Sequence, residues 1–150
     1  MKASSQKAPR PGPLIGALLR MPWETVRHRM LIGLHERGFD DLHPAHLSVF
    51  QYPGPDGRRP SELAENLKVS KQALNHLLGQ MERLGYLSRE GDPSDPRARR
   101  VRLTGRGHDA VRVIRLIVEE VEGEWRRDLG AERFAQLREL LVALSGADER

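Results

Sequence analysis

The chain has 150 residues, 38% hydrophobic and 31% charged, so it is long enough for one domain with an attached oligomerisation element. It contains no cysteine, which excludes a disulfide framework, a thiolate zinc site and thiol-based peroxide sensing. No apolar run is long enough for a membrane span or a signal peptide, so we expect a cytoplasmic protein. The net charge of +4 is small, so the placement of the positive side chains is more informative than their sum.

The first part of the chain predicts an arm and a helix. Residues 1–13 are rich in Pro, Ser, Lys and Arg, which predicts a flexible basic N-terminal arm. Residues 14–37 carry apolar side chains at helical spacing. Pro22 interrupts that pattern, and because proline removes a backbone donor, the helix should kink or restart there.

A second helix and a loop follow. Residues 44–52 predict a helix with Leu47 and Phe50 directed inward. Residues 53–57 are rich in Pro and Gly and predict a loop. Residues 58–59 are expected to add a short strand to a later hairpin.

Residues 60–84 predict a helix-turn-helix. Pro60 suits a first helical position, and Ser70 can cap the second helix through its hydroxyl. Apolar side chains recur on one face of that second helix at helical spacing. Its opposite face carries side chains that can reach phosphates and base edges, namely Lys71, Gln72, Asn75, His76, Gln80 and Arg83. Gly85 should end the helix, since glycine is favoured just past a helix C-terminus.

A β-hairpin is predicted next. Residues 86–89 and 101–104 have the character of strands, and the segment between them holds turn residues and an arginine-rich loop. Five arginines lie on the hairpin and its exit, namely Arg97, Arg99, Arg100, Arg102 and Arg106. Such a run can be a solvated loop, but its place beside a polar helix face favours a nucleic-acid-binding surface.

The C-terminal part predicts two more helices. Thr104 can cap a helix over residues 105–129, whose apolar positions are wider than one stripe, which indicates burial on more than one side. Gly130 breaks the chain, and residues 131–144 predict a last helix with one apolar face. The simplest cover for these surfaces is a second copy of the chain, because most soluble oligomers are two-fold symmetric. The alternative is an intramolecular helical hairpin without a dimer.

The middle of the chain resembles the MarR family of bacterial transcription regulators. The run Asp95-Pro-Arg-Ala-Arg-Arg-Val-Arg-Leu-Thr104 is similar to the family pattern D-R-R-x-x-x-V-x-L-T, and residues 62–64 and 81–87 resemble two further family segments. Two positions depart from the pattern. Pro96 replaces the first of two wing arginines, and Lys68 stands where many helix-turn-helix motifs carry glycine.

The resemblance implies a mainly α fold, a winged helix-turn-helix with a small antiparallel β-hairpin wing and terminal helices that form a dimerisation region. Residues 44–104 would be the DNA-binding domain, and residues 14–43 and 105–146 the dimerisation region. It also implies a cleft for a small aromatic or anionic effector, lined by Trp23, Arg27, Met30, Leu31, His46 and Phe50. Taken singly, each apolar residue among these is more typical of a plain core.

We therefore expect a homodimeric, sequence-specific regulator of double-stranded DNA, a repressor rather than an activator, that reads a palindromic operator and is released by an effector. Ser61 and Ser70 are expected to donate to phosphates. The expected base-edge contacts are Lys71, Gln72, Asn75 and His76, and the wing contributes Arg97, Arg99 and Arg100. No enzyme, cofactor or metal site is expected, because no nucleophile motif or diagnostic histidine spacing is present. A non-specific architectural DNA-binding protein and a protein–protein adaptor remain as alternatives.

Overall fold

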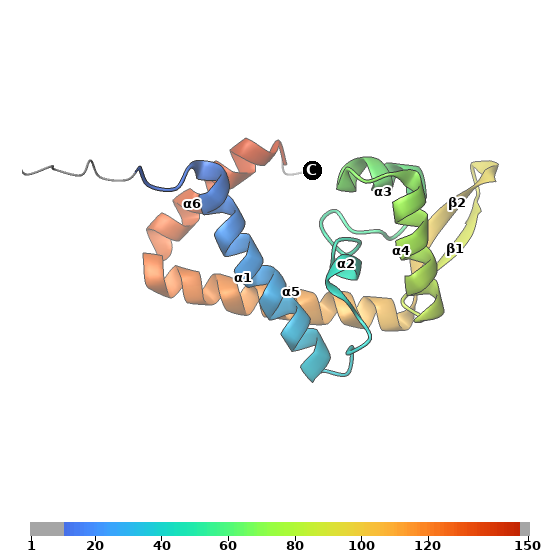
Figure 1. Cartoon of the computed structure of the whole chain (residues 1–150), viewed down its shortest axis with the longest axis horizontal. Helices are drawn as coiled ribbons and strands as arrows, with labels where there is room; N and C mark the ends of the chain where they lie inside the picture. The colour runs from blue at the N-terminus through green and yellow to red at the C-terminus, as the bar shows by residue number, and fades with distance from the viewer. Residues whose placement is uncertain (1–10, 148–150) are drawn as a thin grey trace, which may run out of the picture.

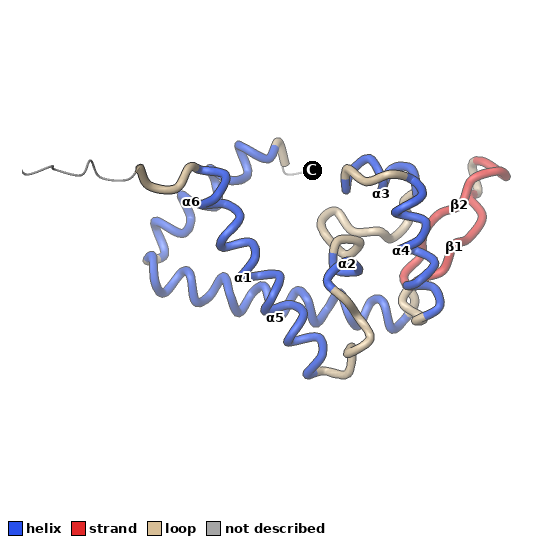
Figure 2. Tube along the Cα trace, viewed as in Figure 1, coloured by secondary structure: helices blue, strands red, loops and turns tan. Residues whose placement is uncertain are grey.

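A computed structural model describes residues 11–147; most of the predicted N-terminal arm, residues 1–10, lies outside the described residues. The described chain forms α1 (Ile15–Glu36), α2 (Pro44–Leu47), α3 (Pro60–Leu67), α4 (Lys71–Arg83), β1 (Leu87–Asp92), β2 (Asp95–Leu103), α5 (Gly105–Leu129) and α6 (Ala131–Ser145). Helices α2 to α4 and the hairpin lie at one end of α5, and α6 lies at the other (Figure 1; Figure 2). The predicted winged helix-turn-helix, mainly helical with one two-stranded antiparallel hairpin, is confirmed.

Helix α1 crosses α5 at close range. Val26, Met30 and Leu34 form its buried face. At Gly33 a Cβ atom would lie 2.4 Å from Cδ1 of Ile117, so glycine allows the two helices to approach closely. The helix continues through Pro22 and does not restart there, contrary to one of the two expected outcomes.

The segment after α1 differs from the prediction in two ways. The helix expected over residues 44–52 ends at Leu47, because the N–H groups of Val49 and Phe50 bond to carbonyls three residues back, as in turns. Leu47 and Phe50 are nevertheless buried, as predicted. The short strand expected at residues 58–59 does not form. Instead the N–H of Gly57 and the carbonyl of Arg58 make single hydrogen bonds of 2.7 and 2.8 Å to the backbone of Val101.

The helix-turn-helix follows its local sequence signals. Helix α3 begins at Pro60 and is followed by Lys68, which has φ 53°, the left-handed conformation that most L-residues avoid. The hydroxyl of Ser70 accepts the N–H of Ala73 at 3.0 Å, so Ser70 caps α4 as predicted. The apolar face of α4 is buried in the core, and its polar face is left outward.

The wing is longer than predicted, and its arginines lie in a strand. Leu87 pairs with Leu103 and Gly91 with Arg99, so the ladder extends through most of the expected loop. Only Pro93 and Ser94 separate the two strands, because the carboxylate of Asp92 accepts both the N–H and the hydroxyl of Ser94 and closes a tight turn. The prediction that these arginines lie in a loop is therefore wrong. Arg97, Arg99 and Arg100 lie in β2.

The winged half joins α5 at a compact joint around Tyr86, which is fully buried. Its hydroxyl donates to Asp41, and the Arg106 guanidinium stacks 4.4 Å above its ring while also bonding Asp41 at 2.9 Å. Burial, and then the hydrogen bond to Asp41, raise the pKa of Tyr86. Gly107 faces the same place, since a Cβ there would lie 2.0 Å from the Tyr86 carbonyl oxygen. The end of α4, the start of α5 and the segment after α1 are thus held together.

The other half of the molecule leaves an apolar surface uncovered. The exposed apolar side chains of α1 and α6 include Ile15, Leu18, Leu19, Trp23, Leu140, Leu141 and Leu144. A groove of about 720 Å³ between α1, α5 and α6 is lined mainly by such residues. Between residues 11 and 147, no helix is both long and apolar enough to cross a bilayer. The uncovered surface is the kind that protein partners cover in soluble proteins.

Candidate nucleic-acid interface

The N-terminal half of α4 presents the predicted polar face. Lys71, Gln72, Asn75 and His76 are all exposed, on the turns that follow the Ser70 cap. The first helical N–H groups also lie here, and they favour negative charge such as a phosphate. The hydroxyl of Ser70 is engaged as an acceptor in the cap but retains its own proton to donate. This arrangement suits insertion into a groove.

Arg89 on β1 joins this face, although the sequence reasoning missed it. Its guanidinium bonds Glu82 of α4 at 2.6 Å and reaches the Oδ1 of Asn75 at 3.3 Å. Asn75, Arg89, Arg99 and Pro60 line an open notch of about 560 Å³ between α4 and the wing. Side chains alternate along a strand, so Arg89 lies on the same face of β1 as Leu87, which is buried against the core. This alternation is the sequence signal that could have placed Arg89 on the face of β1 that packs toward α4.

A chain of polar side chains runs behind the face of α4. Buried His46 of α2 accepts the N–H of His43 on its Nδ1, and its Nε2 lies 3.0 Å from Oε1 of Gln80. Gln80 contacts the Nε2 of His76 at 3.0 Å through its own amide nitrogen. His46 is therefore a satisfied interior residue. Across residues 11–147, no three His, Asp or Glu side chains gather as a metal ion would require.

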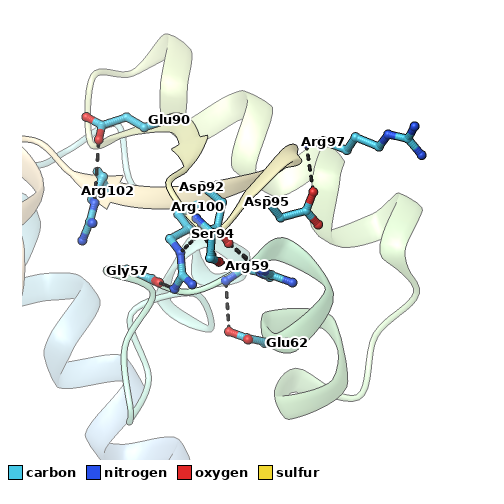
Figure 3. A network of polar contacts seen from close by, with 10 residues as sticks. All are labelled: Gly57, Arg59, Glu62, Glu90, Asp92, Ser94, Asp95, Arg97, Arg100 and Arg102. Atoms are coloured by element: carbon cyan, nitrogen blue, oxygen red, sulfur yellow. Dashed lines mark hydrogen bonds and ion pairs between the residues drawn. The ribbon is translucent and has the colours of Figure 1, made fainter.

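The turn of the wing is organised by Asp92, whose side chain is fully buried. Figure 3 shows the side chains gathered around it. Arg59 lies 2.7 Å from one of its carboxylate oxygens, and Arg100 lies 3.0 Å from the other. The N–H of Ser94, and next the Arg100 guanidinium, hold the pKa of Asp92 well below its usual range. Since Arg59 is also the residue that precedes α3, Asp92 ties the wing to the helix-turn-helix.

The wing arginines divide into two kinds. Arg100 is half-buried and bonds the carbonyl of Gly57 at 2.7 Å as well as Asp92, and Arg102 lies 3.7 Å from Glu90. Arg97 and Arg99 are exposed, and the guanidinium of Arg97 points away from the network (Figure 3). The freer positive charge of the wing is therefore carried by Arg97 and Arg99, in the half of β2 that follows the turn.

Two further polar side chains lie at the approaches to this surface. Asp95 accepts the N–H of Arg97 at 3.0 Å, so its carboxylate is engaged within the wing. Ser61 is the second residue of α3 and is half-exposed, so its hydroxyl is near a helix start. Whether it meets a phosphate stays a prediction.

The six effector candidates do not line one common cavity. Met30, His46 and Phe50 are buried in the core. Arg27 and Leu31 line a pocket of about 200 Å³ between α1 and α2. The sixth candidate, Trp23, borders the separate large groove between α1, α5 and α6.

Comparison with known proteins agrees with this geometry. A family model described as the MarR family matches residues 41–98. Apo MarR from E. coli is 23% identical, with a TM-score of 0.68 over 90% of this chain and 98% of that one. The transcriptional regulator Tm0710 from Thermotoga maritima is 28% identical, with a TM-score of 0.57 over 89% and 92%. The transcriptional repressor CouR, solved on a 23-mer DNA duplex, is 22% identical, with a TM-score of 0.67 over 88% and 92%.

The family model covers the helix-turn-helix and most of the wing, and the solved structures share the fold over nearly the whole chain. Tm0710 is described as a transcriptional regulator and CouR as a transcriptional repressor. Residues 41–98 thus match the MarR family model, and the chain has the fold of the solved MarR and Tm0710 structures.

Proposed function

We propose that the protein is a homodimeric repressor that reads a palindromic operator with α4 and the end of the wing. The observation that carries this proposal is that the exposed polar face of α4 lies beside the exposed arginines of β2, since Asn75 and Arg99 line one notch. It rests on residues 44–104 as the DNA-binding part of the chain. The DNA-bound CouR structure, which has the same fold, supports a duplex as the ligand.

The chemistry of this surface separates two kinds of contact. Asn75 and Gln72 can each donate and accept, so they suit base edges such as adenine, which offers N7 and N6–H₂ together. Lys71 and Arg99 suit phosphates. Arg97 suits the minor groove, where narrow A·T stretches enhance the negative potential. Arg100 is proposed to act indirectly, by holding the wing through Asp92.

The dimer is supported by the uncovered apolar surface of α1 and α6, which residues 14–43 and 105–146 contribute. A two-fold axis through these helices would present two copies of α4 to the same face of a duplex. Two identical half-sites about one helical turn apart, or 34–36 Å, would then form the operator. A palindrome is the expected consequence.

The effector site is proposed at the pocket between α1 and α2. Arg27 lines this pocket, and its guanidinium bonds the carbonyl of Pro44 at 3.2 Å, so an anion could bridge α1 and α2. Benzoate is a simple aromatic anion with which to probe it. Benzoate should weaken operator binding by the unmodified protein and should have less effect on Arg27→Gln.

The proposal is tested by selecting the preferred duplex from a random pool and measuring its affinity against a scrambled duplex. Asn75→Ala should lower the preference for the selected duplex by about 1–3 kcal/mol, the range for one bidentate base contact. Arg97→Ala should weaken duplexes with A·T flanks more than those with G·C flanks.

Arg115→Ala is the matched control for charge, because Arg115 is an exposed arginine on α5 that pairs only with Glu119 among the described residues. It should leave both affinities nearly unchanged. A selected pool without a shared sequence would overturn the specific function and leave the architectural alternative. Equal losses for Asn75→Ala on all duplexes would show that α4 does not read bases.

A further inference from the structure

The hydrogen bonds that link His46, Gln80 and His76 behind α4 all have a fixed donor and acceptor. A backbone N–H can only donate, so the Nδ1 of His46, 3.1 Å from the N–H of His43, must be without a proton. A neutral His46 then carries its proton on Nε2. That nitrogen lies 3.0 Å from Gln80 Oε1 and donates to it.

The side-chain amide of Gln80 accepts from His46 and therefore donates to His76. An amide side chain has one accepting oxygen and one donating nitrogen. With Oε1 facing His46, the amide nitrogen of Gln80 faces the Nε2 of His76, 3.0 Å away. The Nε2 of His76 must therefore accept, and its proton must lie on Nδ1. In water a neutral histidine side chain favours the opposite form, with the proton on Nε2.

We propose that His46 and Gln80 hold His76 in the Nδ1–H form, so that His76 reads a hydrogen-bond acceptor on a base edge. The proposal rests on the proposed function of α4. His76 is exposed on the reading face, and no hydrogen bond of the described residues uses its Nδ1. His76 is thus a specificity-determining residue, and Gln80 and His46 are positioning residues that act through it.

A proton held on Nδ1 of His76 should affect which bases this residue prefers. In the major groove, guanine offers N7 and O6, adenine offers N7 and thymine offers O4 as acceptors. Cytosine offers only the N4–H₂ donor there. A histidine that can only donate should therefore disfavour cytosine at the base it meets. A freely rotating, tautomerising histidine could accept from cytosine and would not exclude it.

The first test observes the ring itself. Nitrogen NMR on protein labelled at its histidines, at a mildly alkaline pH where free histidines are neutral, distinguishes the two tautomers. His76→Ala identifies the signals of His76. The unmodified protein should show His76 with its proton on Nδ1, and Gln80→Met, which keeps length but removes both hydrogen bonds, should return it to the Nε2–H form. Gln136→Met, at an exposed position on α6, should change nothing.

The second test measures base preference. Affinities are measured for every single-base change in the selected operator half-site. Loss of one donor contact corresponds to about a 3- to 10-fold loss of discrimination, the range for one hydrogen bond. His76→Ala and Gln80→Met should lose discrimination at the same base pair, and Asn75→Ala should lose it at a different one.

The outcomes separate this inference from the proposed function. An Nε2–H ring at His76 in the unmodified protein overturns the inference whatever the DNA result. Full base discrimination by Gln80→Met also overturns it. If the unmodified protein prefers no sequence, the proposed function fails and the reading role of His76 fails with it, while the tautomer result is unaffected.

Discussion

Replacing Gly107 with alanine should destabilise the protein by about 2–4 kcal/mol, the sum of an overpacking and a capping cost. A Cβ at this position would lie 2.0 Å from the carbonyl oxygen of Tyr86 and 3.0 Å from Leu103 Cδ2. The carbonyl cannot retreat freely, because it accepts the N–H of Thr104 at 3.1 Å. The start of α5 must therefore move by more than about 1 Å, since non-bonded atoms prefer separations near 3.5 Å.

That movement has two costs. Overpacking a tight site costs about 1–3 kcal/mol. The hydroxyl of Thr104 also accepts the N–H of Gly107 at 3.1 Å, and losing this cap costs about 1 kcal/mol more. Urea unfolding at a fixed protein concentration measures the sum, provided that the slope with denaturant stays unchanged.

Gly105→Ala is the matched control, in the same first turn of α5. A Cβ there would meet nothing within 4 Å. Its effect should be small or stabilising by up to about 1 kcal/mol, because alanine restricts the unfolded chain more than glycine does. If Gly107→Ala and Gly105→Ala unfolded at the same urea concentration, the close packing of α5 on Tyr86 would be refuted.

Two other predictions concern acid stability and assembly. The lowered pKa values of Asp92 and Asp41 mean that both carboxylates stabilise the fold above the ordinary aspartate pKa, about 3.9. Hydrogen bonds hold Asp41 in this state against the opposing effect of burial. Stability should therefore fall as the pH drops below about 4, and a pH series of urea unfolding should show a shallower fall for Asp92→Asn. Leu140→Asp combined with Leu144→Asp, at side chains 64% and 76% exposed, should give folded monomers in sedimentation at micromolar concentration. Ile117→Asp should instead unfold the chain, because Ile117 is buried against α1. An unmodified chain that sediments as a monomer would contradict the dimer.

Local signals explain why much of the helix-turn-helix was predictable. The helix boundaries at Pro60, Ser70 and Gly85 are set by residues within the same turn, so they can be predicted from the sequence. The length of α2 was not predictable, because apolar residues three apart, such as Leu47 and Phe50, fit both a helix and a series of turns. The arginine run carried no alternating apolar pattern, and so its place in β2 was hidden.

The parts of the site that sequence could not give depend on distant contacts. Arg59 and Asp92 are far apart in the chain, and only the fold brings them within 2.7 Å. The contact of Gln80 with His46 is equally non-local, so Gln80 was predicted only as one of several polar residues on α4. The effector candidates failed to converge for the same reason, since a shared helical face does not fix which cavity each side chain meets.

Because α1 crosses α5 near the middle of α5, a small rotation at the crossing would displace the ends of α5. Its 25 residues span about 37 Å at 1.5 Å per residue, and the crossing at Ile117 lies about 18 Å from its first residue. A rotation of about 10° at the crossing would shift that first residue, and the winged half joined to it, by about 3 Å. In the proposed dimer this movement would change the distance between the two copies of α4. Replacing Gly33 with a larger residue would then change the crossing, and with it the half-site spacing that the dimer fits.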